Sequence, residues 1–109
     1  MKAHLAGRPG VMATSRLATI EVARACKLAN PSEEVLEEAD RLLSSCTLVA
    51  VSSQVLRAAR KLASSSIRTL DAIHLASALR IDADELLAYD HRLLEAAGEQ
   101  GIRVVSPSA

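Results

Sequence analysis

The stretch TLDAIHLASAL, residues 69–79, is the most apolar segment of this chain and decides how the rest must be arranged around it. Within its interior only Asp71, His74 and Ser77 are polar. A helix that is hydrophobic around most of its circumference belongs in a protein core. We therefore predict a buried helix over residues 69–79, with Asp71 in its first turn and His74 one turn further on.

The segments on either side alternate between helical and extended patterns. Thr14 or Ser15 can cap a first helix that ends near residue 29, and Asn30, Pro31 and Glu33 suit the start of a second. Further helices are expected at 52–63 and 91–97, and short apolar strands at 47–51, 86–89 and 102–105. Strands separated by helices predict a parallel sheet, in which ligands bind beyond the carboxyl ends of the strands. The length predicts a single domain over residues 1–109.

Three carboxylates fall where packing gives no reason for an acid. Glu21 lies in a mostly apolar helix stripe with Leu17 and Leu28, Asp71 opens the buried helix, and Asp90 directly follows an apolar strand. Desolvating an ionised group costs several kcal/mol or more unless a cation or hydrogen bonds offset it. The structural alternatives are an ion pair of Glu21 with Arg24, a helix-dipole role for Asp71 and an N-cap role for Asp90.

A shared divalent cation would explain all three acids together. Carboxylate oxygens from separate elements, at Glu21, Asp71 and Asp90, are the ligands that Mg²⁺ or Mn²⁺ prefers. Such a cation activates water and neutralises the charge that builds on a phosphodiester under attack. Metal-dependent hydrolysis of a nucleic acid is the hypothesis that follows. The alternatives are a generic α/β domain whose acids are caps and ion pairs, and a buried structural role for His74.

Charge and composition limit how a nucleic acid could bind. The 13 basic and 13 acidic residues cancel, which argues against strong nonspecific polyanion binding. With Tyr89 as the single aromatic residue, the chain lacks a platform for stacking bases. The densest basic cluster is Arg57, Arg60 and Lys61, which is either a phosphate-binding patch or a solubilising helix face. The N-terminus has no signal-peptide pattern and no apolar run is long enough to cross a bilayer, so a cytoplasmic protein is expected.

Three segments in order resemble the PIN domain of the VapC toxin type. They are TSRLATIEVAR at 14–24, LDAIHLASAL at 70–79, and AYDHRL at 88–93 running on to GIRVVSP at 101–107. The resemblance implies a three-layer α/β/α fold with a short parallel sheet, and a Mg²⁺-dependent endoribonuclease paired with an antitoxin. It also implies an acidic quartet around the metal, of which Glu21, Asp71 and Asp90 would be three.

The nuclease hypothesis assigns further roles. Thr14 or Ser15 would orient a metal ligand from behind, although a helix cap explains both equally well. The candidates for contact with RNA phosphates are Arg57, Arg60, Lys61 and Arg92.

The chain departs from the family pattern at its N-terminus. The family's first acid follows a hydrophobic strand, whereas this sequence has no acid before Glu21 and no such strand is predicted. We expect a sheet that lacks its first central strand, with backbone groups of two neighbouring strands left unpaired. Two functions remain: an endoribonuclease toxin impaired by the absent first ligand, or a non-catalytic module that dimerises and binds an antitoxin through apolar helical surfaces.

Overall fold

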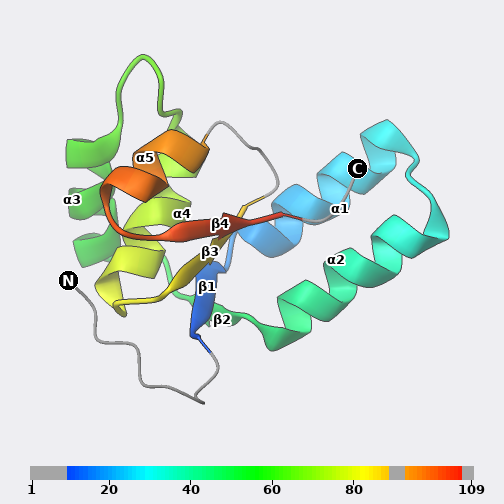
Figure 1. Ribbon diagram of the computed structural model, residues 1–109. Helices are drawn as coiled ribbons and strands as arrows, with labels where there is room; N and C mark the ends of the chain where they lie inside the picture. Colours follow the sequence, from blue (N-terminus) through cyan, green and yellow to red (C-terminus); the bar gives the residue numbers. More distant parts are fainter. Residues whose placement is uncertain (1–9, 89–92, 107–109) are drawn as a thin grey trace.

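The computed structural model describes residues 10–88 and 93–106, which form a helix-rich α/β fold (Figure 1). The elements in chain order are β1 (Met12–Ser15), α1 (Ala18–Ala29), α2 (Glu33–Ser45), β2 (Thr47–Val49), α3 (Ser53–Leu62), α4 (Thr69–Arg80), β3 (Glu85–Leu87), α5 (Leu94–Glu99) and β4 (Arg103–Val105). Among the described residues, no helix has the length and apolar character needed to cross a membrane.

The described strands form one parallel sheet in the order β2-β1-β3-β4. Thr14 is in register with Leu48 of β2, and Ala13 with Leu86 of β3. Helices connect successive strands, as parallel pairing requires. The predicted helix-rich fold with a short parallel sheet is confirmed.

Helix α4 lies between the sheet and α3. Its residues Leu75 and Ala78 pack in one cluster with Ala13 of β1 and Leu86 of β3. On its other side, alanines 72 and 76 pack against α3, in a second cluster with Val55 and Ala59. Every residue from 71 to 78 is buried, so the predicted buried helix is confirmed.

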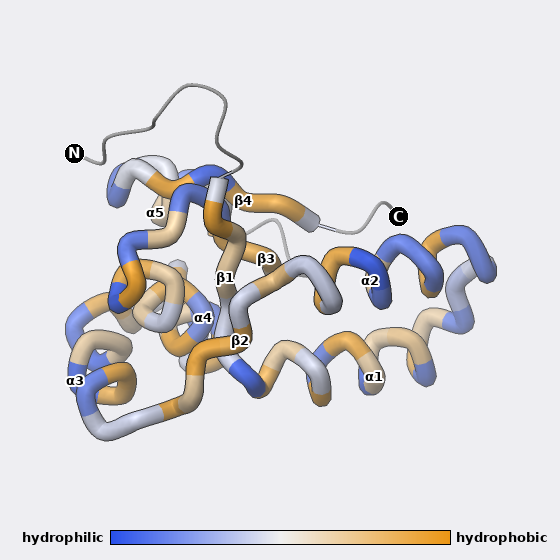
Figure 2. Tube along the Cα trace, turned by 90° about the horizontal axis from the view of Figure 1, so that it is seen from below, coloured by the Kyte–Doolittle hydropathy of each residue, from blue (hydrophilic) through white to orange (hydrophobic). Residues whose placement is uncertain are grey.

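The remaining helices lie on both sides of the sheet. Figures 1 and 2 show α3, α4 and α5 gathered on one side, while α1 and α2 run together on the other and extend away from the sheet. Ala39 of α2 is buried, but large side chains of α1 are left open: Ile20 is 66% exposed and Leu28 is 70% exposed. The predicted apolar stripe of the first helix is therefore wrong at Leu28, because this part of the hairpin extends beyond the core.

The expectation that the first helix begins at Thr14 or Ser15 is wrong. Both residues lie in β1, both side chains are fully buried, and α1 begins at Ala18. Hydroxyl residues before a helical pattern suit an N-cap. Here they form the end of a strand that pairs with a neighbouring strand on each edge.

The expected gap in the sheet is also wrong. β1 is the first strand of the described residues, and it pairs with β2 on one edge and β3 on the other. The two strands that were expected to lack a partner between them, β2 and β3, therefore both pair with β1.

Smaller corrections concern boundaries. Ser32, rather than Asn30, caps α2 by accepting from the Val35 amide, and Asn30 closes α1 in the left-handed conformation at φ 45°. β3 begins at Glu85 and α5 at Leu94, so the predicted helix start at His91 falls outside the described residues.

Because α4 is buried on two sides, truncating one of its core side chains tests this packing. Leu75→Ala should lower the free energy of unfolding by about 3 kcal/mol, because Leu75 is 0% exposed and the cavity cannot be filled by solvent. Leu28→Ala on α1 is the matched control and should change it by less than about 0.5 kcal/mol. Urea unfolding followed by circular dichroism measures both, and equal losses would contradict this packing.

Candidate active site

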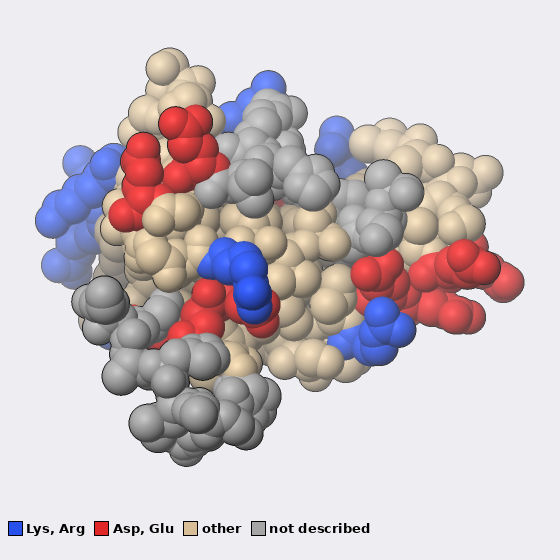
Figure 3. Space-filling view, viewed as in Figure 1, with Lys and Arg blue, Asp and Glu red and all other residues tan. Residues whose placement is uncertain are grey.

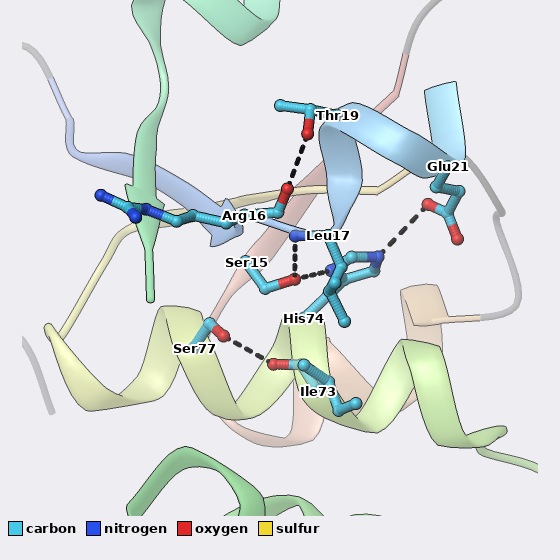
Figure 4. Close-up of polar contacts among 8 residues, drawn as sticks. All are labelled: Ser15, Arg16, Leu17, Thr19, Glu21, Ile73, His74 and Ser77. Carbon is cyan, nitrogen blue, oxygen red and sulfur yellow. Dashed lines mark hydrogen bonds and ion pairs between the residues drawn. The ribbon is translucent and has the colours of Figure 1, made fainter. Parts of the chain in front are cut away.

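Glu21 and His74 meet at the carboxyl end of β1, and Asp71 lies one helical turn from His74 on α4. The chain leaves the sheet at Ser15 and α1 begins at Ala18, so Glu21 lies in the first turn of α1. Helix α4 packs along β1, which places its first turns, with Asp71 and His74, beside this strand end. Figure 4 shows Glu21 and Ser15 on opposite sides of the His74 ring.

His74 is the side chain that joins the strand end to α1. It is 0% exposed, its Nδ1 lies 2.8 Å from Ser15 Oγ, and its Nε2 lies 3.3 Å from Glu21 Oε1. Ser15 Oγ also accepts a hydrogen bond from the Leu17 amide at 3.2 Å. Backbone, hydroxyl, imidazole and carboxylate thus form one chain of contacts from β1 to α1, which we call the Ser15–His74–Glu21 relay.

Glu21 is held at one end and open at the other. Its side chain is 21% exposed, and its contact among the described residues is with His74 rather than with Arg24, so the Glu21 to Arg24 ion pair is not found there. The second carboxylate oxygen, Oε2, makes no ion pair or hydrogen bond to any described residue. A hard cation could therefore take this oxygen without breaking the contact to His74.

Asp71 is almost completely buried, at 6% exposure, in the first turn of α4. Asp71 takes part in a hydrogen bond or another electrostatic contact, as a buried polar residue is expected to do. The position also lies at the positive end of the helix macrodipole, which favours its ionised form.

These residues fit part of a divalent cation site. Glu21 and Asp71 offer carboxylate oxygens, which suit Mg²⁺ or Mn²⁺, and one Glu21 oxygen is uncommitted. Within residues 10–88 and 93–106 no three acidic, His or Cys side chains are grouped closely enough to bind a metal. The third predicted ligand, Asp90, and the predicted phosphate contact Arg92 lie outside the described residues.

Thr14 is placed differently from Ser15. Neighbouring side chains of a strand point to opposite faces, so Thr14 points away from the face on which Ser15 meets His74. Thr14 Oγ1 is buried and has no hydrogen-bond partner among the described residues. Of the two hydroxyls predicted to orient a metal ligand, the structure brings only Ser15 into the relay.

The basic cluster lies on another face of α4. Arg57 and Lys61 of α3 line a shallow pocket of about 390 Å³ with Gln54, Ala58, Leu62 and Leu79. Leu79 is roughly two helical turns from Asp71, so the cluster borders the opposite end of α4 from the acids. Figure 3 shows blue basic side chains where α3 lies and red acidic ones where α2 lies. Arg57, Arg60 and Lys61 are all exposed.

The cysteines carry no chemistry here. Cys26 and Cys46 are both free. Burial raises the pKa of the Cys46 thiol to about 11. Because a thiol reacts as the thiolate, Cys46 is a poor nucleophile at neutral pH.

The role of His74 as a link was not predicted from the sequence. The i, i+3 spacing of Asp71 and His74 put both on one side of a helix, but nothing in the sequence indicated that Ser15 ends a strand beside them. A four-residue strand with two hydroxyl residues carries little periodic signal.

Comparison with known proteins identifies the relatives of this chain. A family model described as PIN domain matches residues 2–99. Ribonuclease VapC46 of Mycobacterium tuberculosis (strain ATCC 25618 / H37Rv) is 40% identical over 97 residues, which cover 87% of this chain and 73% of that protein. Ribonuclease VapC47 of Mycobacterium tuberculosis (strain CDC 1551 / Oshkosh) is 34% identical over 100 residues, covering 89% of this chain and 72% of that protein. No solved structure gives a significant match.

Proposed function

Because this chain belongs to the PIN domain family and is of the VapC type, we propose that it is a metal-dependent endoribonuclease of a toxin-antitoxin pair. The observation that supports the proposal is the contact of Glu21, in the first turn of α1, with His74, one helical turn from Asp71 on α4, at the carboxyl end of β1. In open α/β sheets this is the end at which ligands bind. The proposal includes a single domain over residues 1–109 and a cytoplasmic location.

In this proposal Glu21, Asp71 and Asp90 hold Mg²⁺ or Mn²⁺. When bound, the cation supplies an activated water and neutralises charge on the phosphodiester. Glu21 contributes the oxygen that His74 leaves uncommitted, and Asp71 contributes a carboxylate held by the first turn of α4. With three carboxylates in the proposed ligand set, we expect cleavage to be slower than at a site with four.

Asp71→Asn tests the catalytic proposal. It keeps the shape of the side chain but removes its charge, so RNA cleavage in Mg²⁺ should fall by more than about 100-fold, beyond the effect typical of a residue that only supports a ligand. Asp40→Asn on the exposed face of α2 is the matched control and should cleave as the wild type does. The measurement is cleavage of a fluorescent RNA with Mg²⁺ and with EDTA, and undiminished cleavage by Asp71→Asn would refute the proposal.

We also propose that RNA phosphates bind to Arg57, Arg60, Lys61 and Arg92. The support is the exposure of the three basic residues on α3, which take no part in the ion pairs found among the described residues. Because the cluster and the acids lie at opposite ends of α4, one phosphodiester cannot reach both. The RNA strand would bind the cluster through phosphates several nucleotides from the scissile bond.

Salt dependence of RNA binding distinguishes this role from a solubilising one. Arg57→Gln with Lys61→Gln should lower the slope of log K against log salt by about 1.4, because each phosphate of a single strand that the protein neutralises adds about 0.7 to the slope. Arg24→Gln with Arg41→Gln, on the exposed faces of α1 and α2, is a control of equal charge change. Fluorescence anisotropy with catalytically inactive Asp71→Asn protein measures the slope, and equal slopes in both double variants would rule out a phosphate site on α3.

The exposed face of α1 favours a second function, association with an antitoxin or with another copy of the chain. Ile20 and Leu28 are the most exposed large apolar side chains among the described residues, and α1 extends away from the sheet (Figure 2). Apolar side chains left open on one helix are typical of a surface that a partner covers. This function does not require catalysis.

Leu28→Glu tests the partner surface. It should abolish dimerisation or weaken antitoxin binding more than tenfold, because a charge would be buried in the interface. Leu56→Glu on α3, where Leu56 is 45% exposed, is the control and should associate normally. Light scattering after gel filtration measures the dimer, and titration with the protein encoded beside this gene measures the antitoxin. Unchanged association in Leu28→Glu would place the partner elsewhere.

A further inference from the structure

His74 is a fully buried histidine in contact with Glu21, and the proposed metal ligands do not explain why a histidine occupies this position. A buried imidazole carries two polar nitrogens that must be compensated, whereas an aliphatic side chain would fill the same space without that requirement. His74 is 0% exposed, and both of its nitrogens face polar atoms of β1 and α1. Packing alone therefore does not account for it.

The contacts of Ser15 favour one neutral tautomer of the His74 ring. Ser15 Oγ already accepts the Leu17 amide, and its own hydroxyl proton needs an acceptor. His74 Nδ1, at 2.8 Å, is that acceptor when it carries no proton. The neutral ring then has its proton on Nε2, and this nitrogen lies 3.3 Å from Glu21 Oε1 without making a hydrogen bond to it. The opposite tautomer would leave the hydroxyl proton without an acceptor and turn a lone pair of Nε2 toward the carboxylate.

We propose that His74 is a positioning residue: through its Nε2–H it holds Glu21 Oε1 and so presents Oε2 to the metal. This inference rests on the proposed function, because it assigns the metal-binding carboxylate a fixed orientation. Nε2 has no hydrogen-bond partner among the described residues and lies 3.3 Å from Glu21 Oε1, so the proposal requires this contact to become a hydrogen bond when the carboxylate binds the cation. In this proposal Ser15 orients the His74 ring, and the ring orients the Glu21 carboxylate.

Restricting the Glu21 side chain before the cation binds should raise the affinity of the site for the cation. A free glutamate side chain loses rotamer freedom when it binds a metal, which weakens binding. Glu21 is in a first turn with its side chain still 21% exposed, so the protein must restrict it by a specific contact. Partners of this kind behind a metal ligand typically change metal affinity by about 10- to 100-fold.

The first experiment needs no metal. Long-range ¹H–¹⁵N correlation spectra of the metal-free protein at pH 7.5 show which ring nitrogen of His74 carries a proton. We expect a proton on Nε2, with the Nε2 resonance displaced in Glu21→Ala and the Nδ1 resonance displaced in Ser15→Ala. A ring protonated at Nδ1 alone would overturn the inference, because Nε2 could not then donate to Glu21.

The second experiment uses two variants that divide the ring's contacts. Gln at position 74 can place an amide N–H near the position of Nε2, while Asn can place a polar atom only near Nδ1. Mn²⁺ affinity, measured by electron paramagnetic resonance, should fall about tenfold in His74→Asn and less than about threefold in His74→Gln. Urea unfolding of both metal-free variants separates this effect from stability, since each variant keeps only one of the two ring interactions.

The outcomes separate the inference from the function on which it rests. Wild-type protein that binds Mn²⁺ and cleaves RNA, together with His74→Asn that binds Mn²⁺ equally well, would overturn the positioning role alone. Equal weakening in His74→Asn and His74→Gln would likewise overturn it, because a structural role predicts no rescue. Wild-type protein that neither binds Mn²⁺ nor cleaves RNA would overturn the proposed function and this role with it.

Discussion

Burial of α4 on two sides is the constraint from which the rest of the structure follows. The sheet covers one side and α3 the other, so each polar side chain on this helix must find a partner inside the protein. Ser77 donates to the carbonyl of Ile73 at 2.7 Å, Asp71 has a polar partner, and His74 takes Ser15. The hydrogen bond from β1 to α4 is thus a condition of burying the helix and also the means by which strand and helix are held in register.

The same constraint places the candidate site. Because His74 reaches Ser15 at the last residue of β1, α4 must pass this strand end with its first turns, and Asp71 is carried there with it. Glu21 comes from the other direction, in the first turn of the helix that follows β1. The buried His74 ring thus joins Glu21 to the helix that carries Asp71, 50 positions further along the sequence.

The sequence was sufficient for some elements and insufficient for others. Helix α4 could be predicted because its composition alone requires burial, and α3 because Ser52 supplies a clear cap at its first turn. β1 could not, because its four residues carry no alternation and its hydroxyl residues equally suit a helix start. Of the site, the carboxylates at 21 and 71 could be proposed from residue type. The contact between Ser15 and His74 depends on pairing 59 residues apart, which no local pattern contains.

The separation of charge on the surface bears on how a neutral protein could bind RNA. The exposed acids of α2 and the exposed bases of α3 lie at different ends of the molecule, and each group has side chains of the opposite sign beside it (Figure 3), so the net charge of zero is unevenly distributed over the surface. Over a distance longer than about 10 Å, salt at 0.1 M screens one group from the other. An RNA strand close to α3 therefore meets a basic surface, while α2 repels it. The exposed bases of α3 are therefore the candidate contact for RNA phosphates, since the buried residues 71–78 of α4 offer the strand no surface.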